Sequence, residues 1–264
     1  MWFFFFFIIG CSADRVSKNA DNALERHDLA EAEALYREAL GKQPKHVNSL
    51  VGLGWTYQLA GEREAAAQVF DRCLQFQEKH PDCLRGRASV ALSSGDNVVA
   101  RELMETAYAA NPDHPGVLSS MALLRLNEGN LPRAEEVYSS LRRRFPDRAE
   151  YDMGLGEVKF RKGESQEAVA LSKEGLQKPG TPIRYRAMLW ALRARALIKS
   201  TAGVEDPERC EQTAPPVFAW IQSAQEAVEE AEKTGVSLPD LPIVKRQVLR
   251  RKAILLENCP TAGK

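Results

Sequence analysis

Residues 47–80 read VNSLVGLGWTYQLAGEREAAAQVFDRCLQFQEKH, and their small and bulky positions recur along the chain every 34 residues. The clearest series is an alanine that returns without any change of spacing at Ala32, Ala66, Ala100, Ala134 and Ala168. Gly54, Gly61 and Phe70 have counterparts at the same interval that are of similar size except at His27 and Ser172. Such a period predicts one small structural unit copied along the chain, because a single unit of this length cannot bury its apolar face alone.

Each unit is predicted to be a pair of antiparallel helices. Gly54 and Ala66 mark the crossing point, because minimal side chains let two helix backbones approach within about 8–10 Å. Gly61 ends the first helix, since glycine accepts the left-handed backbone found at many helix C-termini. Proline stops the second helix and restricts the residue before it, at Pro44, Pro112 and Pro146. Bulky residues are expected to fill the space between successive hairpins, at Tyr36, Phe70 and Tyr138.

This pattern resembles the tetratricopeptide repeat (TPR) family over roughly residues 13–180, most clearly at Leu50, Leu53, Gly54 and Tyr57. The resemblance implies an all-α fold: a right-handed TPR superhelix, or α-solenoid, of about five to six helical hairpins plus a C-terminal capping helix. We expect five TPR units over residues 12–182, which close on the breaker between Gln177 and Pro182. Residues 183–264 are expected to form a degenerate sixth hairpin and the capping helix.

Residues 1–11 are predicted to be a lipoprotein signal peptide. An apolar run over residues 2–9 leads into Ile8-Ile9-Gly10-Cys11, which resembles the bacterial lipobox. The resemblance implies an acylated Cys11 and an outer-membrane lipoprotein that faces the periplasm, because two acyl chains anchor stably. No Lys or Arg precedes the run, which departs from the usual signal. The alternatives are an atypical cleaved signal and an apolar terminus without such a role.

Composition and motifs argue against several functions. The chain has 36 basic and 36 acidic residues among 264, so its charge does not favour nucleic-acid binding. No catalytic triad order, metal motif or phosphate-binding loop stands out, so we expect no enzyme, no cofactor and no small-molecule substrate. Three histidines follow the 34-residue spacing, at His46, His80 and His114. They are interpreted as residues of the loops between repeats, because equivalent positions lie too far apart to share one metal ion.

Four cysteines remain besides Cys11, and none forms a Cys-x-x-Cys pair, so no metal site is predicted. In an oxidising compartment, the hypothesis is a disulfide between Cys210 and Cys259. Cys73 is interpreted as a small buried core residue. A bridge from Cys73 to Cys83 is the alternative.

The concave face is the candidate partner-binding groove. In the TPR family, positions 2, 5, 9, 12 and 13 of a repeat tend to line it. Here the groove candidates are Asn48, Trp55, Gln58, Arg85, Leu123, Asn127, Met153 and Phe160. Their aromatic, aliphatic and arginine side chains would suit an extended segment or a helix of another protein. The alternative is that some of them pack against neighbouring helices.

The function predicted from the sequence is a membrane-anchored scaffold or adaptor. It would bind a protein partner through its groove and help to assemble an envelope complex. The architecture resembles the accessory lipoproteins of Tad and type IV pilus assembly and of secretion systems, whose partner would be an outer-membrane channel or pilus component. One alternative is a structural envelope lipoprotein without a specific peptide groove, and another is an adaptor for cell-wall enzymes.

Overall fold

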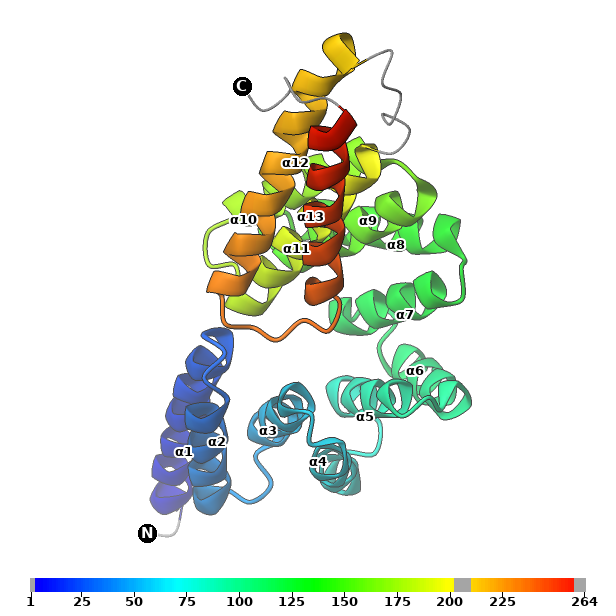
Figure 1. The fold of residues 1–264 in the computed structure, drawn as a ribbon. Coiled ribbons are helices and arrows are strands. Elements are labelled where there is room, and N and C mark those ends of the chain that lie inside the picture. Colours follow the sequence, from blue (N-terminus) through cyan, green and yellow to red (C-terminus); the bar gives the residue numbers. More distant parts are fainter. Residues whose placement is uncertain (1–2, 202–209, 259–264) are drawn as a thin grey trace. The chain divides into compact units, whose positions relative to one another are not determined.

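The fold consists of helices alone in the part of the chain that the structure describes (Figure 1). The computed structural model describes residues 3–201 and 210–258, with side chains over residues 12–201 and 216–257. The predicted all-α TPR fold is confirmed. The helices are α1 (Phe3–Glu25), α2 (Leu29–Lys42), α3 (Val47–Ala60), α4 (Arg63–Phe76), α5 (Pro81–Ser93), α6 (Asn97–Ala110), α7 (Pro115–Asn127), α8 (Leu131–Arg144), α9 (Ala149–Lys162), α10 (Ser165–Gln177), α11 (Ile183–Ser200), α12 (Cys210–Lys233) and α13 (Leu241–Asn258).

The recurring alanines lie inside the hairpins. All five are fully buried: Ala32, Ala66, Ala100, Ala134 and Ala168. Short turns join the two helices of each hairpin, and the first helix of four hairpins is followed by a glycine with φ between 80° and 88°, at Gly61, Gly95, Gly129 and Gly163. The same turn of the first hairpin holds His27 at φ 63°. A side chain with a Cβ carries a conformational cost there that glycine does not.

Aromatic rings fill the junctions between hairpins. Tyr36, Phe70 and Tyr138 are almost completely buried, and each ring lies against a glycine of the next hairpin, in the pairs Tyr36–Gly52, Phe70–Gly86 and Tyr138–Gly154. A Cβ on any of these glycines would overlap the ring. Each glycine therefore leaves the space that the ring of the preceding hairpin occupies, which makes neighbouring hairpins complementary in shape.

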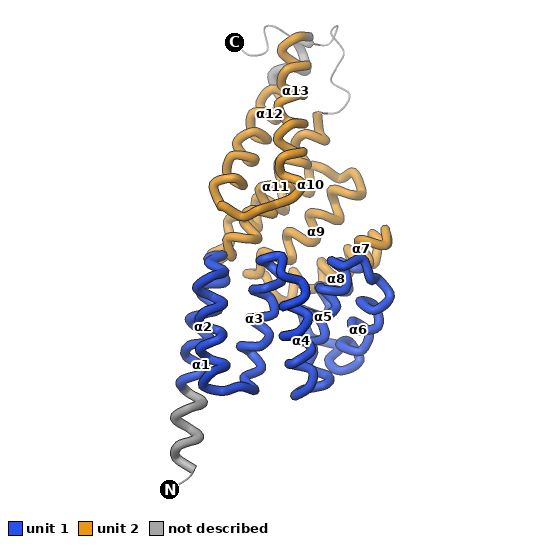
Figure 2. The backbone as a smooth tube through the Cα atoms, turned by 60° about the horizontal axis from the view of Figure 1, so that its bottom comes forward, with its two compact units in different colours: residues 1–124 blue, residues 125–264 orange. Residues whose placement is uncertain are grey.

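The chain divides into two compact units, residues 1–124 and 125–264, coloured separately in Figure 2. The core of the first unit includes Tyr36 from the first hairpin and Leu50 and Phe70 from the second. The core of the second unit is built largely where α11, α12 and α13 pack together, and it includes Ile221, Val228 and Val248.

Helices α11, α12 and α13 occupy the region in which the degenerate sixth hairpin and the capping helix are expected. α12 begins at Cys210 and includes Pro215 and Pro216. Beyond the prolines, Ile221, Ala224 and Val228 are buried at helical spacing, so α12 packs through one apolar stripe. Among the described residues, no helix combines the length and apolarity needed to cross a bilayer.

Candidate protein-binding surfaces

In the first unit, the candidate surface centres on a stacked pair. The guanidinium of Arg85 lies 4.6 Å from the ring centroid of Trp55, which joins α5 to α3. The indole also meets the buried Phe70 in a T-shaped arrangement, with ring centroids 5.7 Å apart. Trp55 and Arg85 are both half-buried, so each keeps an accessible part. The cation–π geometry fixes the orientation of the arginine.

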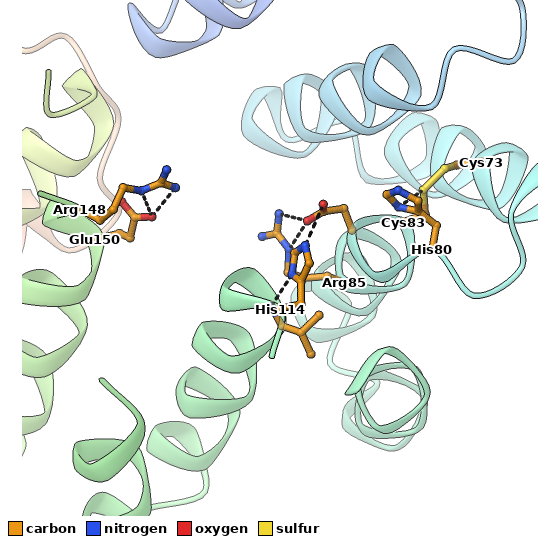
Figure 3. A network of polar contacts seen from close by, with 9 residues as sticks. Cys73, His80, Cys83, Arg85, His114, Arg148 and Glu150 are labelled. Carbon is orange, nitrogen blue, oxygen red and sulfur yellow. Dashed lines mark hydrogen bonds and ion pairs between the residues drawn. A yellow bond between two sulfur atoms is a disulfide. The ribbon is translucent and has the colours of Figure 1, made fainter. Parts of the chain in front are cut away.

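Arg85 is held by a small polar network, visible in Figure 3. It donates to Oδ1 of Asp82 from Nε at 3.1 Å and from Nη2 at 2.9 Å. The other carboxylate oxygen lies 3.3 Å from Nε2 of His114. An added Cβ at Gly116 would lie 3.0 Å from Nε of Arg85, so α7 also confines the arginine. The stack on Trp55 is therefore set in place before any partner arrives.

The other candidates of this unit are less connected. Gln58 is half-buried and donates from Nε2 to Oγ of Ser93 at 2.8 Å, which links α3 to α5. Asn48 is exposed on α3. Leu123 is 44% exposed on α7, an unusual position for a large aliphatic side chain. None of the predicted groove residues in this unit is fully buried.

The histidines that follow the repeat spacing lie at the N-termini of helices. Nδ1 of His46 accepts from the backbone N–H of Ser49, and Nδ1 of His114 accepts from that of Val117, both at 3.3 Å. Both histidines therefore cap the first turn of a helix, a role that the loop interpretation missed. His80 precedes α5 in the same way, but its Nδ1 lies 3.5 Å from Sγ of Cys83 instead.

Cys73 and Cys83 form a disulfide between α4 and α5, with Cα atoms 6.1 Å apart. Cys73 is buried as expected, but it is bonded, so the alternative pairing is the one that the structure contains. The ring of His80 lies beside the bond (Figure 3), and burial lowers the pKa of this histidine. The ligand atoms of Cys73, His80 and Cys83 lie within 4.8 Å of one another, a cluster that the sequence did not predict. With the sulfurs bonded to each other, neither is a thiolate that could bind a metal ion.

In the second unit, the candidate Phe160 lies under two cations. The guanidinium of Arg195 is 4.4 Å and Nζ of Lys199 is 4.7 Å from its ring centroid. Lys199 also donates to the Phe160 carbonyl at 2.9 Å. Arg195 makes a two-pronged ion pair with Glu157, at 3.0 and 3.2 Å. Phe160 therefore repeats the arrangement of Trp55, in which a half-buried aromatic ring is covered by an arginine from the first helix of the next hairpin.

A cavity of about 830 Å³ opens beside Phe160, between α11 and α13. Its apolar lining includes Ile198, Ile243 and Val244. Four basic side chains and one acidic side chain also line it, namely Arg195, Lys199, Arg250, Arg251 and Asp240. The volume falls in the range of about 300–1,000 Å³ that is typical of ligand sites. The sequence identified Phe160 as a groove candidate, but it did not show that the ring lines a cavity together with residues of α11 and α13.

The two other candidates of the second unit are not part of this cavity. Met153 is half-buried on α9, and Asn127 is exposed at the end of α7. Both positions are accessible, but neither residue lines the cavity beside Phe160. The membership of all eight predicted residues in one binding groove stays a prediction.

A lysine-centred cluster in the same unit is better explained by stability than by binding. Nζ of Lys159 lies 2.8 Å from Glu135, 2.7 Å from Glu164 and 2.9 Å from Glu167. Hydrogen bonds from Lys159 and Lys162 lower the pKa of Glu135, and the same contacts raise the pKa of Lys159. These ion pairs connect α8, α9 and α10, so they strengthen the hairpin junction.

Three predicted sites lie outside the described side chains. They are the lipidation site Cys11 and the two members of the hypothetical disulfide, Cys210 and Cys259. Acylation of the first and the bridge between the other two therefore stay predictions.

Comparison with solved structures gives several TPR proteins of similar fold. TTC0263, a thermophilic TPR protein of Thermus thermophilus, superposes with a TM-score of 0.59 at 15% identity, over 68% of this chain and 98% of that one. Pseudomonas aeruginosa pilF superposes with a TM-score of 0.52 at 14% sequence identity, and the match covers 90% of this chain and 97% of that one. A chain of the APC/C heterotetramer Cut9–Hcn1 superposes with a TM-score of 0.62 at 12% sequence identity, and the match covers 90% of this chain but 43% of that one. Such low identities establish the fold alone.

The family is shown by sequence. A search of curated proteins finds no match. The family model described as tetratricopeptide repeat matches residues 23–89 and 91–158, which together make up half of the chain. These ranges contain four of the five spaced alanines, namely Ala32, Ala66, Ala100 and Ala134. The chain belongs to the tetratricopeptide repeat family.

Proposed function

We propose that this protein is a non-catalytic scaffold that binds a segment of another protein on the first helices of its hairpins. The observation that carries the proposal is the repeated pairing of an accessible aromatic ring with an arginine, Trp55 with Arg85 and Phe160 with Arg195. Aromatic and arginine side chains dominate the energetics of many protein interfaces. Because both arginines are already ordered by carboxylates, little side-chain entropy is lost when a partner binds.

The finer part of the proposal concerns location. We infer that Cys11 is acylated, that the protein is held at the outer membrane facing the periplasm, and that it assists assembly of an envelope complex such as a pilus or secretion system. The lipobox-like sequence that ends at Cys11 supports this part. Two acyl chains on one residue would suffice for a stable anchor.

Crosslinking in native membranes tests partner binding. The wild-type chain and a Trp55→Ala/Phe160→Ala variant would be captured after crosslinking, and the recovered proteins quantified by mass spectrometry. We expect one partner to be enriched with the wild type and reduced about tenfold or more with the variant, in line with the loss of two interface anchors. Tyr108→Ala is the matched control, because Tyr108 is 41% exposed but lies on the second helix α6. Equal recovery with all three chains would refute binding through the aromatic–arginine pairs.

A separate experiment tests the anchor. Cys11→Ser should move the protein from the membrane fraction to the soluble fraction, whereas Ser12→Ala should leave it membrane-bound. Mass spectrometry of the mature N-terminus should find a diacylated cysteine. An unmodified Cys11 in a membrane-associated chain would disprove the lipid anchor without affecting the proposal of partner binding.

A further inference from the structure

We infer that the cavity between α11 and α13 binds an acidic peptide segment that carries an aliphatic side chain. This inference deepens the proposed function, on which it rests, by naming the chemistry of the partner at one site. Phe160 forms part of the cavity lining, and the remaining lining residues come from α11, from α13 and from Asp240 just before α13. Two features of the lining would recognise this segment: basic side chains that have no carboxylate partner among the described residues, and the exposed apolar side chain of Ile243.

The charge of the lining is not balanced from within. Arg195 is largely neutralised by Glu157, and Asp240 lies 3.8 Å from the same guanidinium. Lys199 makes hydrogen-bond and cation–π contacts with Phe160, and neither of these supplies a negative charge. Among the described residues, Lys199 and Arg250 have no carboxylate partner. Two cations at the rim of one cavity favour an anionic ligand, and carboxylates are the groups that lysine and arginine bind most strongly in peptides.

The apolar part of the lining favours a ligand that also carries an apolar group. Ile243 is 50% exposed although it lies beside the buried Val244 and Ile198. An aliphatic side chain of a bound segment would cover Ile243 and remove apolar surface from water. A free inorganic anion would gain nothing from this contact. Charge and apolar surface together therefore point to a peptide that combines carboxylates with an aliphatic residue.

The inference can be tested with three fluorescein-labelled peptides and the full-length chain, by fluorescence polarisation. The first peptide alternates Glu and Leu, the second replaces Glu by Gln, and the third replaces Leu by Ser. We expect saturable binding of the first alone, weakened as salt rises, because exposed charge pairs are screened. Equal binding of the Gln peptide or of the Ser peptide would overturn the inference.

Matched variants place the binding on the cavity. Arg250→Gln and Lys199→Gln should each raise the Kd of the acidic peptide about tenfold, the expected effect of losing one charge-assisted contact. Arg246→Gln is the control, since Arg246 is exposed on the same helix but does not line the cavity. Ile243→Ser should weaken binding similarly, whereas Leu249→Ser, 51% exposed on α13 outside the cavity, should not. Equal effects of targets and controls would refute the assignment.

Vesicles distinguish a membrane surface from a peptide. If vesicles containing phosphatidylglycerol bind the chain with the same variant dependence while the acidic peptide does not, the cavity recognises lipid headgroups and the inference is wrong. Failure of the peptide assay alone would leave the proposed scaffold function standing, because that function is judged by the loss of the captured partner in the Trp55→Ala/Phe160→Ala variant.

Discussion

Replacing Gly86 by alanine should reveal how tightly neighbouring hairpins fit. Gly86 lies in α5 of the third hairpin, and its missing side chain leaves room for the ring of Phe70 from the second hairpin. Phe70 is completely buried and also has Gly54 on its own hairpin beside it, where an added Cβ would lie 2.6 Å from the ring. The ring is thus confined between two helices and cannot move aside freely.

Two effects of the substitution oppose each other. Alanine favours the helix over glycine by about 1 kcal/mol, whereas overpacking in a buried junction costs about 1–3 kcal/mol. Because the new Cβ would overlap the ring rather than touch it, we take the cost near its upper limit. The expected net effect of Gly86→Ala is a destabilisation of about 1–2 kcal/mol.

Gly41→Ala provides the matched control. Gly41 lies in α2, and an added Cβ there would meet nothing within 4 Å. This change should stabilise the protein by about 0.5–1 kcal/mol, since only the helix propensity acts. Urea unfolding followed by circular dichroism measures the free energy of unfolding of both variants. An unchanged m-value would show that the substitutions do not alter the surface exposed on unfolding.

A further variant separates the overlap from other causes. In a Phe70→Leu chain the ring is absent, so adding Gly86→Ala should destabilise the protein much less or even stabilise it. A double-mutant cycle would show this difference as a coupling free energy between positions 70 and 86. If Gly86→Ala stabilises the wild-type chain as much as Gly41→Ala does, the argument that the ring requires the glycine is refuted.

Three further outcomes are expected. Reduction of the Cys73–Cys83 bond should lower the free energy of unfolding by about 3 kcal/mol, because the bond closes a loop of about ten residues in the unfolded chain. The stability of a Cys73→Ser/Cys83→Ser chain should not change with dithiothreitol, and a change would contradict this account. His27→Gly should raise the free energy of unfolding by about 1 kcal/mol, because His27 has φ 63°; no gain in urea unfolding would argue against strain there. Lys159→Met should reduce the contribution of Glu135 to stability, although Lys162 still holds its pKa below the ordinary value of 4.5. The lowered pKa of Glu135 stabilises the fold above pH 4.5, and this stabilisation is lost as the pH falls through the folded value; an acid unfolding curve unchanged by the substitution would count against it.

The hairpins were predictable from the sequence because their requirements are local and repeat at one interval. The alanine at each crossing and the glycine at each turn satisfy the same steric demand in every unit, so one unit explains the others. The pairing of rings with glycines also follows a fixed interval, since Tyr36–Gly52 and Phe70–Gly86 are each separated by 16 residues. It was missed because the two members belong to different hairpins, and the spacing within one hairpin does not show it.

The binding surfaces were only partly predictable. Trp55 and Arg85 could be placed on the first helices from their positions in the repeat, but their stacking depends on the angle between two hairpins. The cavity beside Phe160 depends on how α13 packs, and that helix follows no repeat. The disulfide presents a similar problem, since Cys73 and Cys83 face each other only because the loop between α4 and α5 turns as it does.

The same disulfide has a mechanical consequence. A stack of hairpins that is pulled from its ends lengthens as successive hairpins separate and unravel. The covalent link between α4 and α5 shields the residues it encloses from the applied force. About ten residues would be missing from the stretched chain, equivalent to about 35 Å of contour length. In a single-molecule pulling experiment, the second and third hairpins would therefore remain tethered to each other after both had unravelled, until a reductant released the hidden length.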